Sequence, residues 1–284
     1  IDNASCDASA TLLERAHPAA LIRNAENRGF AAAANQGIAA TSDPWVLLLN
    51  PDVRLEEGYI EECVAALERA GERFGSATGT LYRAEGAEMR ALAAIDSTGI
   101  RMTRSGRHLD IDDPPAPRGA APREVFGVSG AAAVWRRRCL EHLAVGGEIF
   151  DEDFFAYRED AALAWRARLF GWKSIHVAEA IAYHVRRVTP EVRGELPDEI
   201  NMHSVKNRFL LRLKNEGRAL AIRHAPWELG RDLTVAVATL TVERTSLPAW
   251  RWLWRNRARI WKKREEIQRR RVVSDRELLP WFGR

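Results

Sequence analysis

Apolar and polar positions alternate over the first 70 residues in a way that predicts strands and helices in turn. The alanine-rich segment 31–40 predicts a helix, and the unbroken apolar run 46–49 that follows it is typical of a buried parallel strand. The next helix, 56–70, repeats its apolar positions on one face at Tyr59, Cys63, Ala66 and Leu67. It stops before Gly71, a usual helix terminator. A strand, a loop, a helix and a strand in this order predict a doubly wound α/β sheet.

The pattern loosens between residues 75 and 122 and then becomes regular again. Short strands and a polar loop, "IDDPPAPRGAAPRE", are expected there, because closely spaced prolines disfavour regular structure. The segment "VFGVSGAAAVWRRRCLEHL" predicts a strand, a bend and a helix from about Arg136. Residues 161–170 predict a helix closed by Gly171, and "SIHVAEAIAYHV" returns as a strand.

Beyond Asn201 the chain predicts long helical segments rich in arginine and tryptophan. Six of the ten tryptophans lie at or after Trp227. This change of character places a boundary near residue 216, which divides the chain into residues 1–215 and a basic, Trp-rich helical region, 216–284.

Composition limits the class of protein. With 284 residues, of which 46% are hydrophobic and 29% charged, the chain can bury a large core. Three widely spaced cysteines indicate neither a disulfide framework nor a zinc cluster, so a reducing, cytoplasmic setting is expected. No signal peptide is visible in the first residues, and the longest apolar stretch, 233–242, is about half of the ~20 residues that span a bilayer. We therefore expect no membrane-crossing segment.

The net charge of +4 is concentrated near the C-terminus. Residues 251–271 contain ten Lys/Arg and two Glu, with large apolar side chains expected on one helical side: Trp250, Leu253, Trp254, Trp261 and Ile267. This pattern predicts a helix lying on an anionic membrane. The alternative is that the tryptophans pack on the rest of the protein while the arginines are solvated. A basic run alone is common, so no nucleic acid is expected as a partner.

Three polar positions at predicted element ends are candidates for chemistry. Asp52 follows a strand in "LLLNPDV", at the sheet edge where α/β folds bind ligands, although Asn, Pro and Asp also form plain turns. Asp160 stands at the start of a helix, where it could be a base or only a cap. His184 ends a strand and could meet a divalent ion or be an ordinary polar residue. Taken together, the three are more informative than any one of them.

An ordered set of motifs resembles a known family. In sequence they are "IDNASCDAS", "NRGFAAAANQGI", "LLLNPDV", "VFGVSGAAAVWRR", "FDEDFFAYRED", "WRARLFGW" and "AIAYH". They resemble the family 2 glycosyltransferases, most closely the rhamnosyltransferase-type branch that builds bacterial cell-surface polysaccharide. The resemblance covers about residues 1–215 and implies a GT-A fold, a Rossmann-like mixed sheet flanked by helices, followed here by a C-terminal helical extension.

The resemblance implies roles for individual residues. Asp160 matches the catalytic base, and Glu159 is expected to act as an acceptor-side or orienting group. Asp52 matches the last acid of the family's DxD-like metal motif, and His184 matches a strand-end histidine that helps hold the metal and diphosphate. Residues expected to shape the nucleotide pocket are Asp2, Asn24, Asn27, Asn35 and Asn50. Burial beside Phe154 and Phe155 should raise the pKa of Asp160, and the remaining acids of this segment (Asp151, Glu152 and Asp153) are expected to be solvated.

The implied reaction is inverting transfer of a sugar, such as rhamnose, from a nucleotide-sugar donor. The acceptor would be a lipid-linked or polysaccharide hydroxyl, the cofactor Mg²⁺ or Mn²⁺, and the location the cytoplasm, peripheral on the inner face of the plasma membrane. Two departures from the family stand out. Ala162 occupies the place of a second acid, and members of the family usually begin about 30 residues earlier with a strand and helix. These departures motivate an alternative, a glycosyltransferase-like protein that binds nucleotide sugar but has lost turnover.

Overall fold

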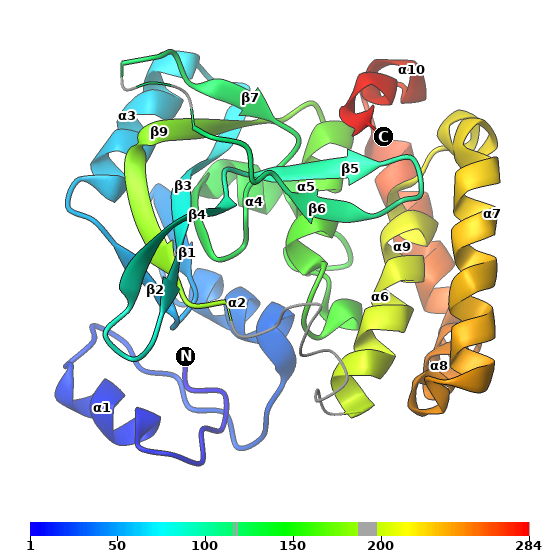
Figure 1. Ribbon diagram of the computed structural model, residues 1–284, viewed down its shortest axis with the longest axis horizontal. Helices are drawn as coiled ribbons and strands as arrows, with labels where there is room; N and C mark the ends of the chain where they lie inside the picture. Colours follow the sequence, from blue (N-terminus) through cyan, green and yellow to red (C-terminus); the bar gives the residue numbers. More distant parts are fainter. Residues whose placement is uncertain (116, 118, 187–197, 284) are drawn as a thin grey trace.

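The computed structural model describes residues 1–115, 117, 119–186 and 198–283. At its centre is a mixed β-sheet with the spatial order β1-β8-β3-β9-β2, to which β4 and β7 are added beside β3 and β9. Figure 1 shows this sheet in one half of the molecule and a group of long helices in the other. The strand bounds are β1 Trp45–Leu49, β2 Val53–Leu55, β3 Phe74–Glu85, β4 Arg90–Ser97, β7 Arg123–Val125, β8 Ala132–Arg136 and β9 Lys173–His184.

The sheet is less parallel than the apolar runs predict. Only β3 and β9 run parallel in the central row, and β1 pairs antiparallel with β8. The prediction of a buried parallel strand at 46–49 is therefore wrong in direction, and its residues are half-buried or exposed because β1 lies at the end of the row. The region after residue 75 holds the long strands β3 and β4 as well as the short strands Ile100–Thr103 and His108–Asp110. In the predicted loop 111–124, the described residues up to 122 lack helix and strand, whereas Arg123 and Glu124 belong to β7.

Helices cover both faces of the sheet. On one face lies α3 (Tyr59–Ala70), which buries the four predicted apolar positions against β3 and β9. On the other face lie α2 (Gly29–Ala39), α4 (Arg137–Leu143) and α5 (Glu159–Leu169). A short helix, α1 (Ser9–Arg15), stands at the N-terminal edge. The mixed α/β sheet with flanking helices is the predicted fold class.

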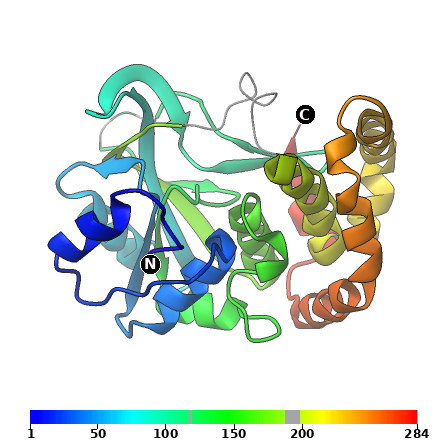
Figure 2. The same cartoon turned by 90° about the horizontal axis from the view of Figure 1, so that it is seen from below.

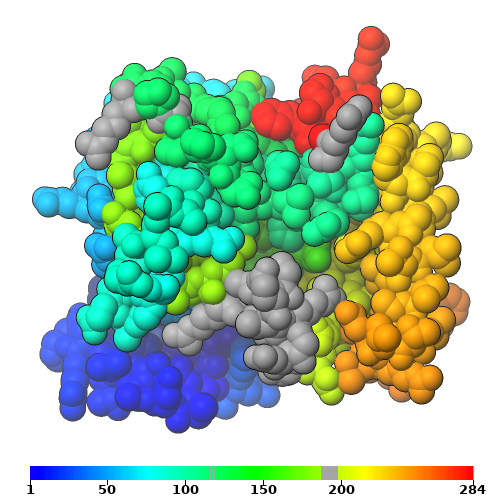
Figure 3. All heavy atoms as spheres, viewed as in Figure 1, coloured from blue at the N-terminus to red at the C-terminus, as the bar shows by residue number. Residues whose placement is uncertain are grey.

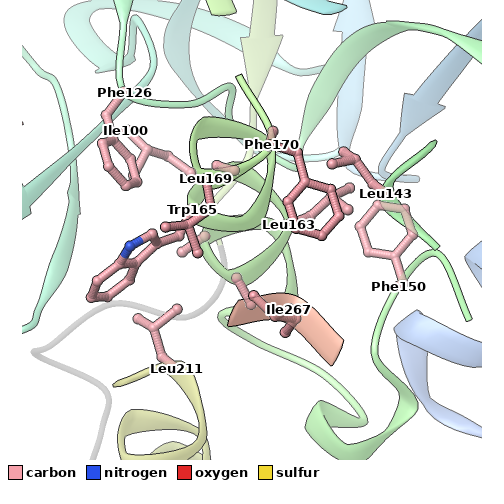
Figure 4. Packing of buried hydrophobic residues seen from close by; sticks show 14 of the residues in the cluster. Ile100, Phe126, Leu143, Phe150, Leu163, Trp165, Leu169, Phe170, Leu211 and Ile267 are labelled. Atoms are coloured by element: carbon pink, nitrogen blue, oxygen red, sulfur yellow. The ribbon is translucent and has the colours of Figure 1, made fainter. Parts of the chain in front are cut away.

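The C-terminal helices enclose α5 from the side away from the sheet (Figure 2). Their bounds are α6 Asp198–Asn215, α7 Arg218–Thr241, α8 Pro248–Arg255, α9 Arg257–Arg270 and α10 Asp275–Leu278. Figure 4 shows Leu211 of α6 and Ile267 of α9 packed beside Trp165 and Leu163 of α5. The predicted division falls between α6 and α7, and one hydrophobic cluster contains residues from both sides of it.

A small second sheet fixes the end of the chain. Strands β5 (Ile100–Thr103) and β6 (His108–Asp110) form a hairpin, and the two-residue β10 (Phe282–Gly283) runs parallel to β5. The ring of Phe282 lies 5.0 Å from that of Trp165 on α5, measured between ring centroids. The C-terminal segment is thus packed on the core that supports α5.

The basic tail does not form the single helix with one apolar side that the sequence predicts. The chain breaks at Asn256 between α8 and α9, so the five apolar residues belong to two helices. Ile267 is buried in the core, whereas Trp254 is 69% exposed. Among the described residues, no helix combines the length and the apolar character that crossing a bilayer requires.

Candidate active site

The ends of β2 and β9 bring Asp52 and His184 together. Val53, the first residue of β2, pairs with His184, the last residue of β9, in antiparallel register. The residue before Val53 therefore lies beside the imidazole, and Oδ1 of Asp52 is 3.5 Å from Nε2 of His184. The two side chains that the sequence proposes as metal ligands share one edge of the sheet.

Asp96, at the end of β4, fixes the histidine ring. Its Oδ2 lies 2.7 Å from Nδ1 of His184, and its side chain is fully buried. Burial alone would raise the pKa of Asp96, but the His184 hydrogen bond and the Arg186 charge lower it below its ordinary value. An ionised Asp96 accepts the proton of Nδ1, so the lone pair of Nε2 is directed toward Asp52.

The donor set at this edge fits a divalent cation. Oδ1 of Asp52 is buried and has no hydrogen-bond partner, and an imidazole nitrogen faces it. A carboxylate oxygen and a neutral imidazole held by a second carboxylate are a usual metal-binding combination. The site therefore has the composition that Mg²⁺ or Mn²⁺ would need, with further ligands supplied by water and substrate oxygens.

Arg186 connects this edge with the end of β6. Its guanidinium contacts Asp96 (Nε to Oδ1, 2.8 Å) and Asp110 at the end of β6 (Nη2 to Oδ2, 2.7 Å). Burial raises the pKa of Asp160, and the negative charge of Asp110 adds to that rise. Arg186 thus joins Asp96 to Asp110, and the charge of Asp110 acts on the predicted base, Asp160.

Asp160 and Glu159 begin α5 after a strained backbone segment. Phe155, Tyr157 and Arg158 have φ values of 65°, 68° and 72°, which side-chain-bearing residues rarely adopt. Asn207 of α6 is fully buried, and its Nδ2 lies 2.9, 2.7 and 2.7 Å from the carbonyl oxygens of residues 154, 156 and 157. An amide nitrogen has two hydrogens, so it shares them among three acceptors.

Two close contacts set the position of this segment. Gly130 donates its N–H to Oδ2 of Asp160 at 3.2 Å, and a Cβ at Gly130 would lie 3.0 Å from the Cβ of Asp160. Gly29, with φ +83°, begins α2, and a Cβ there would lie 2.5 Å from the carbonyl oxygen of Phe155. The motifs "NRGF" and "VSGA" therefore carry glycine where their backbone lies against Phe155 and Asp160, because a larger residue would not fit there.

The two carboxylic acids at the start of α5 hold their protons more tightly than usual. Burial, and then the neighbouring Asp160, raise the pKa of Glu159 to about 8, and Oε2 of Glu159 is buried without a partner. Burial also raises the pKa of Asp160, while the N–H groups of Ala161 and Gly130 oppose that rise. Raised pKa values of acids at the start of α5 suit a general base that works near neutral pH.

The predicted nucleotide-pocket residues lie around α2 and the first loop. Asp2 caps the N–H of Ser5 (3.0 Å) and its carbonyl accepts from Asn24 (2.9 Å). Asn24 and Gln36 exchange two side-chain hydrogen bonds of 2.9 Å each. Asn27 accepts from the N–H of Gly29 at 2.9 Å.

Asn35 and Asn50 are held by other parts of the chain. The amide of Asn35 exchanges two hydrogen bonds of 2.8 Å with the backbone of Phe150, which ties α2 to the segment before α5. Asn50 bonds Ala131 through its backbone. Asn27 and Asn50 also line a cavity of about 670 Å³ between α2 and β1. The role of each of these side chains in binding a nucleotide stays a prediction.

Two of the acids expected to be solvated are buried instead. Asp151 and Asp153 are 6% and 5% exposed, and both contact the ammonium group of Lys214 on α6. Lys263 of α9 adds a contact to Asp151 at 2.7 Å, whereas Glu152 is exposed as expected. The prediction fails because the partners of these acids are distant lysines, and sequence spacing does not reveal such pairs.

Sequence reasoning also missed Asp96, Arg186 and Asn207. Asp96 is the second-last residue of its strand, in "AIDSTG", and Arg186 comes two residues after His184, so the rule that singles out strand ends could have included both. Asn207 lies inside a helix that carries many charged residues, and no local signal distinguishes it.

A second group of possible ligands lies where α6 meets α7. Glu216, His224 and Glu228 are all buried, and one ligand atom of each lies within 4.8 Å of those of the others. The pKa of Glu216 is raised to about 9 by burial and by its hydrogen bond with Glu228. A proton shared between the two carboxyl groups accounts for this contact, so the group does not require an ion.

Comparison with known proteins decides the family. The sequence model of Glycosyl transferase family 2 matches residues 1–143, half of the chain. The chain belongs to glycosyl transferase family 2.

Two relatives of this family 2 protein are rhamnosyltransferases. The N-acetylglucosaminyl-diphospho-decaprenol L-rhamnosyltransferases of two Mycobacterium tuberculosis strains, CDC 1551 / Oshkosh and ATCC 25618 / H37Rv, are each 28% identical to it over 207 residues. The match covers 64% of this chain and 64% of each relative, so it spans less than two thirds of their length.

Solved structures support the fold of this family 2 chain. Staphylococcus aureus TarS 1–349 in complex with UDP-GlcNAc has a TM-score of 0.53 at 13% identity, covering 94% of this chain and 80% of that one. GalNAc-T7 with UDP, GalNAc and Mn²⁺ has a TM-score of 0.52 at 13% identity, covering 68% and 36%. At these identities the likeness shows the GT-A fold alone.

Proposed function

We propose that the chain transfers a sugar from a nucleotide-sugar donor to an acceptor hydroxyl. The observation that carries the proposal is the single sheet edge on which Asp52, His184 and Asp96 meet. A second observation supports it: Asp160, at the start of α5, is a carboxylic acid with a raised pKa. Family membership supports the reaction class, and the mycobacterial relatives support rhamnose as the sugar and a diphospho-polyprenol-linked acceptor. Residues 1–215 would carry the reaction, with 216–284 as an extension that completes the support of α5.

Each of the four proposed site residues, Asp52, His184, Asp160 and Glu159, would have one role in the reaction. Asp52 and His184 would hold a divalent ion, which GalNAc-T7 also contains, and the ion would stabilise the diphosphate leaving group. Asp160, ionised, would accept the proton of the acceptor hydroxyl as that oxygen bonds to the anomeric carbon. One base and direct displacement invert the configuration at that carbon. Glu159, protonated below its pKa of about 8, would orient the acceptor by donating a hydrogen bond.

The second candidate is a protein that binds nucleotide sugar without turnover. Ala162, at the place of the family's second acid, is 7% exposed and packs in the hydrophobic core of α5. No carboxylate is available at that position to bind an acceptor. This alternative keeps the donor site and the metal ligands and removes only the transfer.

Nucleotide release from a panel of nucleotide sugars distinguishes these functions. The chain would be assayed with Mn²⁺, with Mg²⁺ and with EDTA, beside Asp160→Asn and the exposed control Asp113→Asn. We expect release from one donor that requires metal, persists in Asp113→Asn and falls about 10²-fold or more in Asp160→Asn. Donor binding by calorimetry without release in any variant would favour the second candidate. Release that is indifferent to both metal and Asp160 would contradict the assigned base and ligands.

A further inference from the structure

An unpartnered apolar face runs along the whole of α7, the helix at the outer edge of the molecule (Figure 1). Its exposed aliphatic residues recur at spacings of seven, four, four and three, which places them on one side of the helix. This outer stripe consists of Ile222, Leu229, Leu233, Val237 and Leu240. Leu229 and Leu233 are 67% and 66% exposed. Soluble surfaces rarely carry so long an apolar row without a use for it.

The outer stripe is followed along the chain by exposed apolar and basic residues at the start of α8 and on α8 itself, and this group is called the basic turn. Trp250 on α8 donates its Nε1–H to Thr239 of α7 at 3.1 Å, so α8 is held against the C-terminal end of α7. The outward residues of this basic turn are Leu247, Arg251, Trp254 and Arg255. All six charged residues from Arg244 to Lys262 are arginine or lysine. Within the described part of the chain, neither Arg251 nor Arg255 has an ion-pair partner.

We propose that the outer stripe and the basic turn dock on an anionic lipid surface. Aliphatic side chains would enter the boundary between headgroups and acyl chains, Trp254 would lie at headgroup level, and the arginines would pair with lipid phosphates. Figure 3 shows α7 and its continuation, yellow to orange, forming one edge of the visible surface, where a flat partner can reach them. The inference rests on the proposed function, because an acceptor linked to a diphospho-polyprenol would be anchored in a lipid membrane.

The charges argue against a second copy of the chain as the occupant. In an antiparallel pair of α7 helices, the basic turn of one copy would meet the exposed Arg218 and Arg223 of the other. In a parallel pair, two basic turns would meet. The acids of α7 offer no compensation, because Glu228 is buried and Asp232 is paired with Arg212. Like charges repel in both arrangements, whereas an anionic surface attracts every one of these arginines.

Vesicle co-sedimentation of the full chain tests the proposal. Vesicles of phosphatidylcholine alone would be compared with vesicles that also contain phosphatidylglycerol. The variants are Leu229→Ser/Leu233→Ser in the stripe and Arg251→Glu/Arg255→Glu in the turn. The control is Leu12→Ser/Arg15→Glu on α1, where both residues are also exposed. Circular dichroism and the thermal midpoint would confirm that each variant is folded.

We expect binding only to the anionic vesicles, and weaker binding in high salt. Each test variant should lower the partition coefficient at least about 10-fold, while the control stays at the wild-type value. Equal binding of wild type and both test variants would overturn the proposal, and so would no binding by wild type. Sedimentation velocity without vesicles adds an arm: a dimer that Leu229→Ser/Leu233→Ser converts to a monomer would assign the stripe to a second copy instead.

The outcome is separable from that of the proposed function. Nucleotide release by the wild-type chain is measured in solution without vesicles, so it does not depend on docking. Vesicle binding with no nucleotide release from any donor would support the docking surface and contradict the proposed transferase activity. Nucleotide release from a donor with no vesicle binding would support the transferase activity and contradict the docking surface.

Discussion

The imidazole of His184 and the carboxylate of Asp96 form a buried pair, with Nδ1 and Oδ2 separated by 2.7 Å. The pair leaves Nε2 of the ring as the atom that faces Asp52. Asp96 itself lies too deep in the sheet to be solvated, with its side chain fully buried. The histidine is therefore oriented before any ligand arrives, and its orientation depends on a residue outside the proposed ligand set.

We predict that Asp96→Asn weakens Mn²⁺ binding about 10- to 100-fold in the presence of nucleotide. The amide removes the negative charge that fixes the Nδ1–H tautomer and that pairs with Arg186. Calorimetric titration of Mn²⁺ into the chain with UDP and, separately, other nucleoside diphosphates measures the change. Asp112→Asn, an exposed acid of the loop after β6, is the matched control. Unchanged Mn²⁺ affinity in Asp96→Asn would show that His184 is not a ligand.

Local pattern was sufficient for the elements but not for the contacts that complete the site. The helix predicted at 56–70 begins three residues later, at Tyr59, and buries the apolar face that its periodicity predicts, and the predicted strand that ends at His184 is β9. The family motifs led to Asp52 and His184, which the register of β2 and β9 brings within 3.5 Å. Asp96 is 88 positions away from His184 along the chain, and only the folded sheet relates the two.

The buried acids show the same limit. Asp151 and Asp153 read as part of a solvated turn, since acids are seldom buried without partners. Their partners, Lys214 and Lys263, lie at least 61 positions further along the chain. Ion pairs between distant residues do not appear as a periodic pattern in the sequence. The contacts that α6 and α9 make with the segment before α5 could therefore not be predicted.

The activity should depend on pH through the acids at the start of α5. Asp160 must be ionised to accept a proton, so kcat/KM should rise with pH as its raised pKa is passed. The charge of Asp110 contributes to that raised pKa. Asp110→Asn should therefore move the rising limb to lower pH, with little change in the plateau. The pH profiles of nucleotide release for wild type and Asp110→Asn measure this shift. A limb that stays in place or moves to higher pH would show that Asp110 does not raise the pKa of Asp160.

Asn207 should matter for turnover more than for donor binding. Its amide holds the carbonyls of the segment with positive φ values just before Glu159 and Asp160. We expect Asn207→Ala to relax that segment, move the base and lower kcat about 10- to 100-fold, while KM for the donor changes little. Steady-state kinetics separate the two constants.

Asn256→Ala is the control for Asn207→Ala, because the side-chain amide of Asn256 donates to a carbonyl of the adjoining helix, that of Trp252, at 2.8 Å. It should leave both constants at wild-type values. An equal loss of kcat in the two variants, or a loss of Asn207→Ala confined to KM, would mean that the amide does not act through the base.

Lys214 should be essential for stability, and its contribution should vanish in acid. The ammonium group is 1% exposed and contacts both Asp151 and Asp153, so Lys214→Met leaves two buried carboxylates with fewer partners. Removing one member of such a network costs about 3 to 5 kcal/mol of unfolding free energy, and Lys263 and Arg259, which remain, favour the lower end of that range. The exposed Lys262→Met should stay within about 0.5 kcal/mol of wild type. Urea unfolding at neutral pH compares the three proteins.

The pH dependence of that difference identifies its origin. Burial alone would raise the pKa of Asp151, but Lys214 and Lys263 lower it well below its ordinary value of 3.8. The stabilisation is therefore complete above about pH 4 and is lost as pH falls toward the folded-state pKa. Wild type should lose stability below pH 4 more steeply than Lys214→Met, so the two unfolding free energies should converge in acid. A difference that stays constant from pH 7 to the acid limit would instead assign the effect of Lys214 to the packing of its aliphatic chain.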